Sequence, residues 1–102
     1  FCDIVLLSLT AAAENELDTA AEILSAMLLK LRETDFSDIS LVVFGPIEAP
    51  LYKINETYKK NFIIKCRFNA RTRLLIRTLI VDFEKKIGKK ITLSVDVNPN
   101  SI

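Results

Sequence analysis

Apolar residues recur at two different periods along the chain, and the change of period marks the predicted elements. Residues 2–10 are apolar on both alternations, which is typical of a strand covered on both faces or nearly so. From Asn15 to Arg32 the apolar residues recur at steps of three and four, the pattern of an amphipathic helix. Asn15 is the expected N-cap, because its side-chain oxygen can accept a hydrogen bond from an unpaired backbone N–H group.

The middle of the chain is predicted to form two strands separated by a proline-containing segment. Ser40 to Phe44 is predicted as a strand that stops at Gly45-Pro46, since proline donates no hydrogen bond to a sheet. Glu48 to Pro50 is then expected to be an extended arm or turn. Tyr58 to Cys66 alternates as a third strand, in which Phe62 faces the core.

The last third of the chain is predicted to add a helix and a strand. The helix runs from about Asn69, a cap candidate, to Ile87, and Gly88 is suited to end it. Ile91 to Val97 alternates as the fourth strand. The order βαββαβ predicts one α+β domain over residues 1–102: a ferredoxin-like, four-stranded antiparallel sheet with both helices on one face.

Charge is divided unevenly between the two halves of the chain. Residues 1–50 carry two basic and nine acidic side chains, whereas residues 51–102 carry twelve basic and four acidic ones, which indicates an anionic partner for the second half. Lys and Arg can neutralise phosphates, and an exposed Tyr can stack on an unpaired base. The candidate DNA-binding residues are Lys53, Tyr58, Lys59, Lys60, Lys65 and Arg67. The alternative is a solvated basic surface whose aromatic residues belong to the core.

Three arginines cluster near the start of the predicted second helix. Arg73 and Arg77 are four residues apart and therefore lie on one side of it, and Arg71 lies in its first turn. A guanidinium fork in such a place suits a carboxylate or a phosphate.

No residue pattern indicates catalysis or a metal centre. The chain has no His, no phosphate-binding loop and no dinucleotide fingerprint, and Cys2 and Cys66 fit a reducing cytosol. The apolar runs fall far short of the roughly 20 residues that a membrane span needs. The chain begins with Phe and shows no signal peptide, so we expect a piece of a longer cytoplasmic protein, with no membrane contact, no metal and no enzymatic activity of its own.

Short motifs in the chain resemble the C-terminal domain of PriA, the bacterial replication-restart helicase. A Gly-Pro-x-x-Ala-Pro segment, a basic aromatic hairpin strand and a closing Asp-Val-x-Pro occur in the family's order and spacing. The residues that match the family motifs are Gly45, Pro46, Ala49, Pro50, Asp96 and Pro99. Lys59 stands where the family usually has Arg, Asn61 where it has Gln, and Asn98 where it has a second Asp.

The resemblance implies a fold similar to a small-subunit ribosomal protein and a place at the end of an ATP-dependent 3′-to-5′ DNA helicase. ATP and zinc are implied for the full-length protein, and no cofactor is implied for this domain. The implied partners are DNA forks, single-stranded DNA, the helicase core of the same chain and the acidic tail of the single-stranded DNA-binding protein. Arg71 is the best match to the family's tail-binding Arg, and Arg73 is the second.

Two other classes of function fit the same pattern of elements. A small-molecule regulatory domain of this topology would pair through sheet edges and bind an effector. A structural domain would only pack on the helicase core, and its charges would be incidental.

Overall fold

The computed structural model describes residues 2–54, 57–88 and 90–99, and the side chains of residues 49–54 lie outside that description. Four strands and two helices follow one another in the predicted order βαββαβ. Their bounds are β1 (Asp3–Ala11), α1 (Glu14–Glu33), β2 (Leu41–Ile54), β3 (Thr57–Cys66), α2 (Ala70–Ile87) and β4 (Thr92–Val97).

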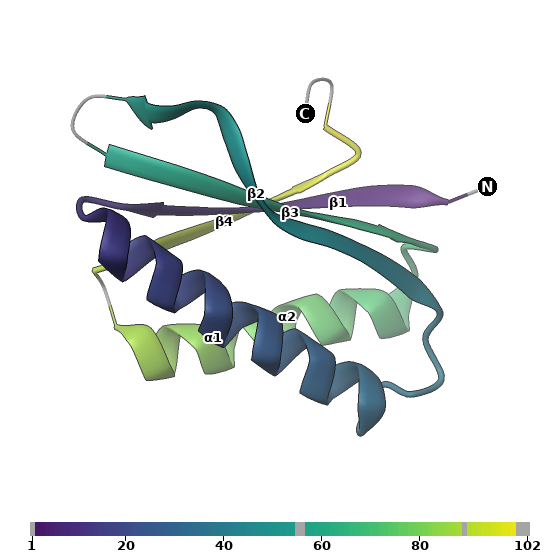
Figure 1. Cartoon of the computed structure of the whole chain (residues 1–102). Helices are drawn as coiled ribbons and strands as arrows, with labels where there is room; N and C mark the ends of the chain where they lie inside the picture. The colour runs from purple at the N-terminus through teal and green to yellow at the C-terminus, as the bar shows by residue number, and fades with distance from the viewer. Residues whose placement is uncertain (1, 55–56, 89, 100–102) are drawn as a thin grey trace.

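The strands form one antiparallel sheet in the order β2-β3-β1-β4. Figure 1 shows α1 and α2 side by side on one face of this sheet, and none of the described residues forms a helix on the opposite face. The ferredoxin-like prediction is therefore confirmed. We call the two surfaces of the sheet the helix side and the open side.

The hydrophobic core lies between the sheet and the two helices. The central strand β1 contributes Val5, Leu7 and Leu9, all with no exposed surface, and β3 contributes Phe62 and Ile64 in the same state. The helices close the core with residues that share one face of each helix, namely Leu17, Ala20, Ala21, Leu24 and Leu28 of α1 and Thr72, Leu75, Ile76, Leu79 and Phe83 of α2. The domain thus has a core of its own, because strands and helices bury their apolar faces against each other.

The two helices begin in different ways. Asn15 is not the cap of α1: the helix begins at Glu14, and its N-cap Ala13 makes no side-chain hydrogen bond. Glu14 and Glu16 in the first turn stabilise this end by charge instead. Asn69 is the cap of α2, as predicted, since its side chain accepts a hydrogen bond from the Thr72 N–H at 3.1 Å.

Strand β2 does not stop at Gly45-Pro46. It runs on to Ile54, and the register of its pairing with β3 shifts between Phe44 and Ile47, so Gly45 and Pro46 form a bulge within an edge strand. Proline is tolerated at a bulge because no ladder hydrogen bond is required of it there. The segment from Glu48 to Pro50 is likewise strand rather than a separate arm.

A glycine is required at the start of this bulge. Gly45 has φ +128°, and a Cβ atom on it would lie 2.8 Å from the backbone oxygen of Asn61 on β3. A side chain here would clash with the neighbouring strand and strain the backbone. The glycine of the Gly-Pro-x-x-Ala-Pro motif is therefore required by the close approach of β3 and by its positive φ.

A polar latch joins the end of β4 to the start of β1. The side-chain oxygen of Asn98 accepts a hydrogen bond from the Ile4 N–H at 2.9 Å, and its amide donates to Asp3 Oδ1 at 3.2 Å. Asp3 Oδ2 accepts a further bond from the Phe68 N–H at 2.8 Å. These donors lower the pKa of Asp3, the Phe68 N–H contributing most. Asn98 thus anchors the end of β4 through one accepted and one donated hydrogen bond, and an ionised Asp at this position could not donate the second.

Candidate nucleic-acid interface

The predicted basic hairpin divides its residues between the two sides of the sheet. Side chains alternate along a strand, so neighbours in β3 point in opposite directions. Phe62, Ile64 and Cys66 are buried on the helix side, which places Tyr58 and Lys60 on that side and Lys59 and Lys65 on the open side. The four β3 residues predicted as one DNA-binding group are therefore not brought together.

On the helix side, Lys60 and Tyr58 contact the domain itself. Lys60 Nζ forms an ion pair with Asp18 of α1, and its side chain is 19 % exposed. Tyr58 packs against the hydrophobic core. Asp18 thereby joins α1 to the hairpin.

On the open side, Lys59 and Lys65 stand at two ends of a mixed surface. Lys65 pairs in register with Ile4 and Val42, and Lys59 pairs with Thr10. Between them the rows of paired residues carry Ile63 and Asn61 on β3 and Leu6 and Ser8 on β1. Within the described residues, Lys59 makes no ion pair.

Phe44 belongs to the same surface, although it is not among the binding residues predicted from the sequence. It lies on the open side of β2, directly opposite Ile63, and 43 % of its surface is exposed. The Lys65 ammonium lies 5.5 Å from its ring centroid. Leu41 is buried on the helix side, so alternation along β2 places Val42 and Phe44 on the open side. This alternation is the sequence signal that could have identified Phe44 as a surface residue.

The centre of the open side is closed by a polar pair. Ser8 donates to the Asn61 side-chain oxygen at 2.8 Å, and both residues are buried, at 4 % and 6 % exposure. Burial of these groups is tolerated because they bond to each other. Asn61, which stands where the family has Gln, therefore has a structural partner within the sheet.

Arg67 and Arg71 line a small hollow where β3 leads into α2. Its volume is about 290 Å³, and Asp38, Asn69 and Thr72 also line it. Arg67 is exposed and makes no ion pair among the described residues.

Arg71 is already bound within the domain. Its guanidinium donates two hydrogen bonds to the Asp38 carboxylate, at 2.7 and 3.1 Å, and a third to the Asp35 carbonyl at 2.9 Å. It also lies 4.7 Å from the centroid of the Phe36 ring. The hydrogen bonds that Arg71 donates to Asp38 lower the pKa of Asp38 and raise the pKa of Arg71. The predicted tail-binding fork is therefore occupied in this structure.

Arg73 is differently placed. Its guanidinium lies 5.5 Å from the centroid of the Phe68 ring, and within the described part of the chain it makes no ion pair. An arginine beside an aromatic ring keeps its donors available, since the ring interacts with the face of the guanidinium and not with its edge.

The remaining predicted residues are distributed over both ends of the sheet. Asp96 lies on the open side of β4, opposite Leu6, and Pro99 is partly buried beyond the latch. The side chains of Lys53, Ala49 and Pro50 lie outside the described residues.

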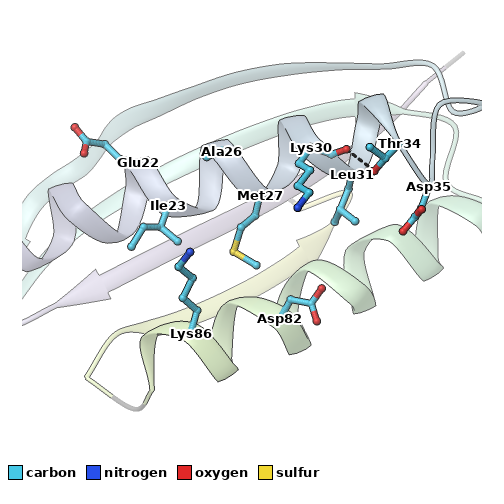
Figure 2. A pocket seen from close by; sticks show the side chains of 10 residues that line it. All are labelled: Glu22, Ile23, Ala26, Met27, Lys30, Leu31, Thr34, Asp35, Asp82 and Lys86. Carbon is cyan, nitrogen blue, oxygen red and sulfur yellow. Dashed lines mark hydrogen bonds between the residues drawn. The ribbon is translucent and has the colours of Figure 1, made fainter.

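A groove also runs between the two helices (Figure 2). Its volume is about 610 Å³, and Ile23, Met27 and Leu31 of α1 line it together with Asp82 and Lys86 of α2. Its charged residues are of both signs, so it shows no preference for an anion. Among the described residues no cluster of His, Cys, Asp and Glu could hold a metal ion, and none of the described helices is long and apolar enough to span a membrane.

Fold and surface together define a ferredoxin-like α+β domain with a basic, partly apolar open sheet face. The model of the primosomal protein N C-terminal domain family matches residues 1–100, and the chain belongs to that family. It is therefore the C-terminal domain of a replication-restart helicase, as the motifs predicted. A search of curated proteins finds no match.

Solved structures support the fold and nothing further. A de novo designed protein is 12 % identical, with a TM-score of 0.63 over 98 % of this chain and 99 % of its own. A second designed protein, described as having a ferredoxin fold, is 11 % identical, with a TM-score of 0.62 over 100 % of this chain and 89 % of its own. A hydantoinase/carbamoylase family amidase from Burkholderia ambifaria is 10 % identical, with a TM-score of 0.59, and this chain covers 27 % of it.

Proposed function

We propose that this domain is a non-catalytic DNA-binding module of a replication-restart helicase in the bacterial cytoplasm, and that its open side contacts DNA phosphates. The observation that carries the proposal is that Lys59 and Lys65 point from the same uncovered face of the sheet. Arg67 follows directly after the strand that holds both lysines and extends the basic surface. Phosphate contacts of this kind position a protein on DNA without reading its sequence.

The acidic half of the chain fits the same orientation. The acidic side chains of α1 lie on the helix layer, opposite the open side, so DNA bound to the open side would be kept away from them. Lys60 supports the proposal less, because Asp18 already neutralises it on the helix side.

Fork DNA labelled with a fluorophore tests the proposal by anisotropy. If about four phosphates are contacted, the logarithm of affinity falls with the logarithm of salt concentration at a slope near −3 to −4. The double variant Lys59→Ala/Lys65→Ala should reduce the size of this slope by about 2. The matched control Lys85→Ala/Lys86→Ala removes the same charge from the last turn of α2 and should leave it near wild type. Equal effects of the two variants would refute the proposal.

We further propose that the start of α2 shares in binding the acidic tail of the single-stranded DNA-binding protein. Arg73 supports this role better than Arg71, since Asp38 and Asp35 hold Arg71 and an aromatic ring flanks Arg73. Calorimetry with an acidic, Phe-terminated peptide and the full helicase should show weaker binding for Arg73→Ala. Unchanged affinity for that variant would contradict the assignment.

A further inference from the structure

The groove between α1 and α2 has an apolar floor that opens to solvent. Ile23, Met27 and Leu31 follow one another at four-residue steps, so they lie along one side of α1 over about 12 Å. They are partly buried and pack against the hydrophobic core. Ala26 and Lys30, which line the groove beside them, are exposed. Figure 2 shows the floor residues between the two helices.

The rim of this groove carries charges of both signs in a definite arrangement. Glu22 and Lys30 of α1 stand on one side of the groove, and Asp82 and Lys86 of α2 stand on the other. Figure 2 shows Lys86 at the Glu22 end of the groove. Asp82 lies toward the opposite end, as does Lys30, and Asp35 lies past the end of α1. The acidic residues of the two helices therefore occupy one diagonal of the rim, and the basic residues occupy the other.

These rim charges are not neutralised within the domain. The ion pairs among the described residues join Lys60 to Asp18 and Arg71 to Asp38, and neither includes a rim residue of α1 or α2. A partner that enters the groove therefore meets charged groups that no other side chain of the described chain has to release first.

A helix suits this groove better than an extended segment. The backbone groups of α1 and α2 bond within their own helices, so the groove offers a partner side chains only. An extended segment lying on the floor would bury its own backbone N–H and C=O groups without partners, which is unfavourable. An amphipathic helix satisfies these groups internally and presents an apolar stripe to the floor.

The charges of the rim further define the partner. Phosphates of a nucleic acid would meet Glu22 and Asp82, and a wholly apolar helix would remove all the rim charges from water without compensation. A helix whose apolar stripe is flanked by residues of both signs compensates each rim charge with an opposite one. Such electrostatic complementarity gives specificity to an interface.

We propose that the groove between α1 and α2 is a docking site for an amphipathic helix of a partner protein. Its apolar stripe covers the floor, and its acidic and basic flanking residues face the opposite charges of the rim. This inference goes beyond the proposed function, because the groove lies on the helix side and the DNA surface lies on the open side. The domain can therefore hold DNA and the partner helix at the same time.

Two synthetic helical peptides test the proposal with the full helicase. Both carry an apolar stripe of leucines, and the matched peptide places Lys and Glu opposite the acidic and basic residues of the rim. In the exchanged peptide every Lys is Glu and every Glu is Lys. Because like charges of the rim lie on one diagonal, turning the exchanged peptide end for end does not restore the match. Anisotropy of fluorescein-labelled peptides should show about tenfold tighter binding of the matched one.

Reversal of the rim charges should reverse this preference. The variant Glu22→Lys/Lys30→Glu/Asp82→Lys/Lys86→Glu leaves the net charge unchanged and should bind the exchanged peptide more tightly than the matched one. A reversed preference cannot result from loss of folding. The control Glu84→Lys/Lys85→Glu exchanges two exposed charges of α2 outside this groove and should keep the wild-type order.

The other outcomes refute the proposal in distinguishable ways. Equal affinity for the two peptides would show that the rim does not select a partner. Absence of binding by both, as expected if the helicase core covers the groove, would also refute it. Self-association in sedimentation that is lost in Ala26→Arg and kept in the control would make a second copy the occupant. Fork DNA should bind the rim-reversed variant as it binds the wild type. Failure of the peptide result alone therefore leaves the proposed function standing, and failure of Lys59→Ala/Lys65→Ala to reduce the salt slope leaves this inference standing.

Discussion

The two sides of strand β3 show that adjacent residues of the same type can have different roles, because alternate side chains point to opposite sides of the sheet. On the helix side, Lys60 binds Asp18 and Phe62 fills the core. On the open side, Lys59 makes no ion pair among the described residues and Lys65 lies over Phe44. Two consecutive lysines thus differ in role because their side chains point in opposite directions. A count of basic residues along the sequence overstates the surface available to one partner.

The largest expected contrast between the two sides is in stability. Phe62→Ala removes a fully buried ring and should reduce the free energy of unfolding by about 3–5 kcal/mol. Ile63→Ala, one residue on and partly exposed on the open side, should cost about 1 kcal/mol. Urea denaturation followed by circular dichroism measures both. Similar losses for the two variants would mean that the open side is packed as a second core.

Gly45→Ala should give the next largest loss of stability, because the added Cβ atom of β2 clashes with the backbone of β3. The added Cβ would meet the Asn61 carbonyl oxygen at 2.8 Å in a backbone with φ +128°, a strain of about 1–3 kcal/mol. Gly88→Ala is the matched control: its φ is +80°, but no atom lies within 4 Å of the added Cβ. Its loss of stability, also measured by urea denaturation, should be smaller. The reverse order would show that contact with β3 is not what requires the glycine.

The buried hydrogen bond between Ser8 and Asn61 should contribute less to the stability of the domain than Gly45 does. Ser8→Ala leaves the Asn61 side-chain oxygen buried without its donor and should cost about 1–2 kcal/mol in thermal unfolding. Ser94→Ala, on the neighbouring strand at an exposed position, serves as control and should have little effect. If the double variant Ser8→Ala/Asn61→Leu is no more stable than Ser8→Ala alone, the unpaired oxygen is not the cause of the loss.

The sequence predicted elements better than it predicted surfaces. The order βαββαβ, the α2 cap and the burial of Phe62 followed from periodicity and local chemistry, which act over a few residues. The continuation of β2 past Pro46 did not, because a bulge opposite β3 depends on a strand distant in the sequence. Alternation in β3 was visible, but its consequence for Lys60 required knowledge of where α1 places Asp18.

The arginines of α2 show the same division. The sequence predicted that Arg71 and Arg73 lie near the start of the helix, and they do. It could not show that Arg71 binds Asp38, because the loop that carries Asp38 meets α2 only in the folded domain. Whether a charged group is available to a partner depends on the tertiary structure, since a partner must first displace any group of the domain that already binds it.

The latch at the helix side of β1 should give the smallest effect, which can be followed as a shift of acid unfolding. Asp3 is the register partner of Cys66 at the end of β3, and its pKa is lowered by the Phe68 N–H and then by the Asn98 amide. A lowered pKa contributes stability above the unfolded pKa, which is about 3.9 for Asp, and that stability is lost as pH falls through the folded value. Asn98→Ala should therefore shift the midpoint of acid unfolding, followed by circular dichroism, to higher pH. Glu33→Gln alters an exposed carboxylate of α1 and serves as control. An unchanged midpoint in Asn98→Ala would show that the latch does not couple to the acid stability of the sheet.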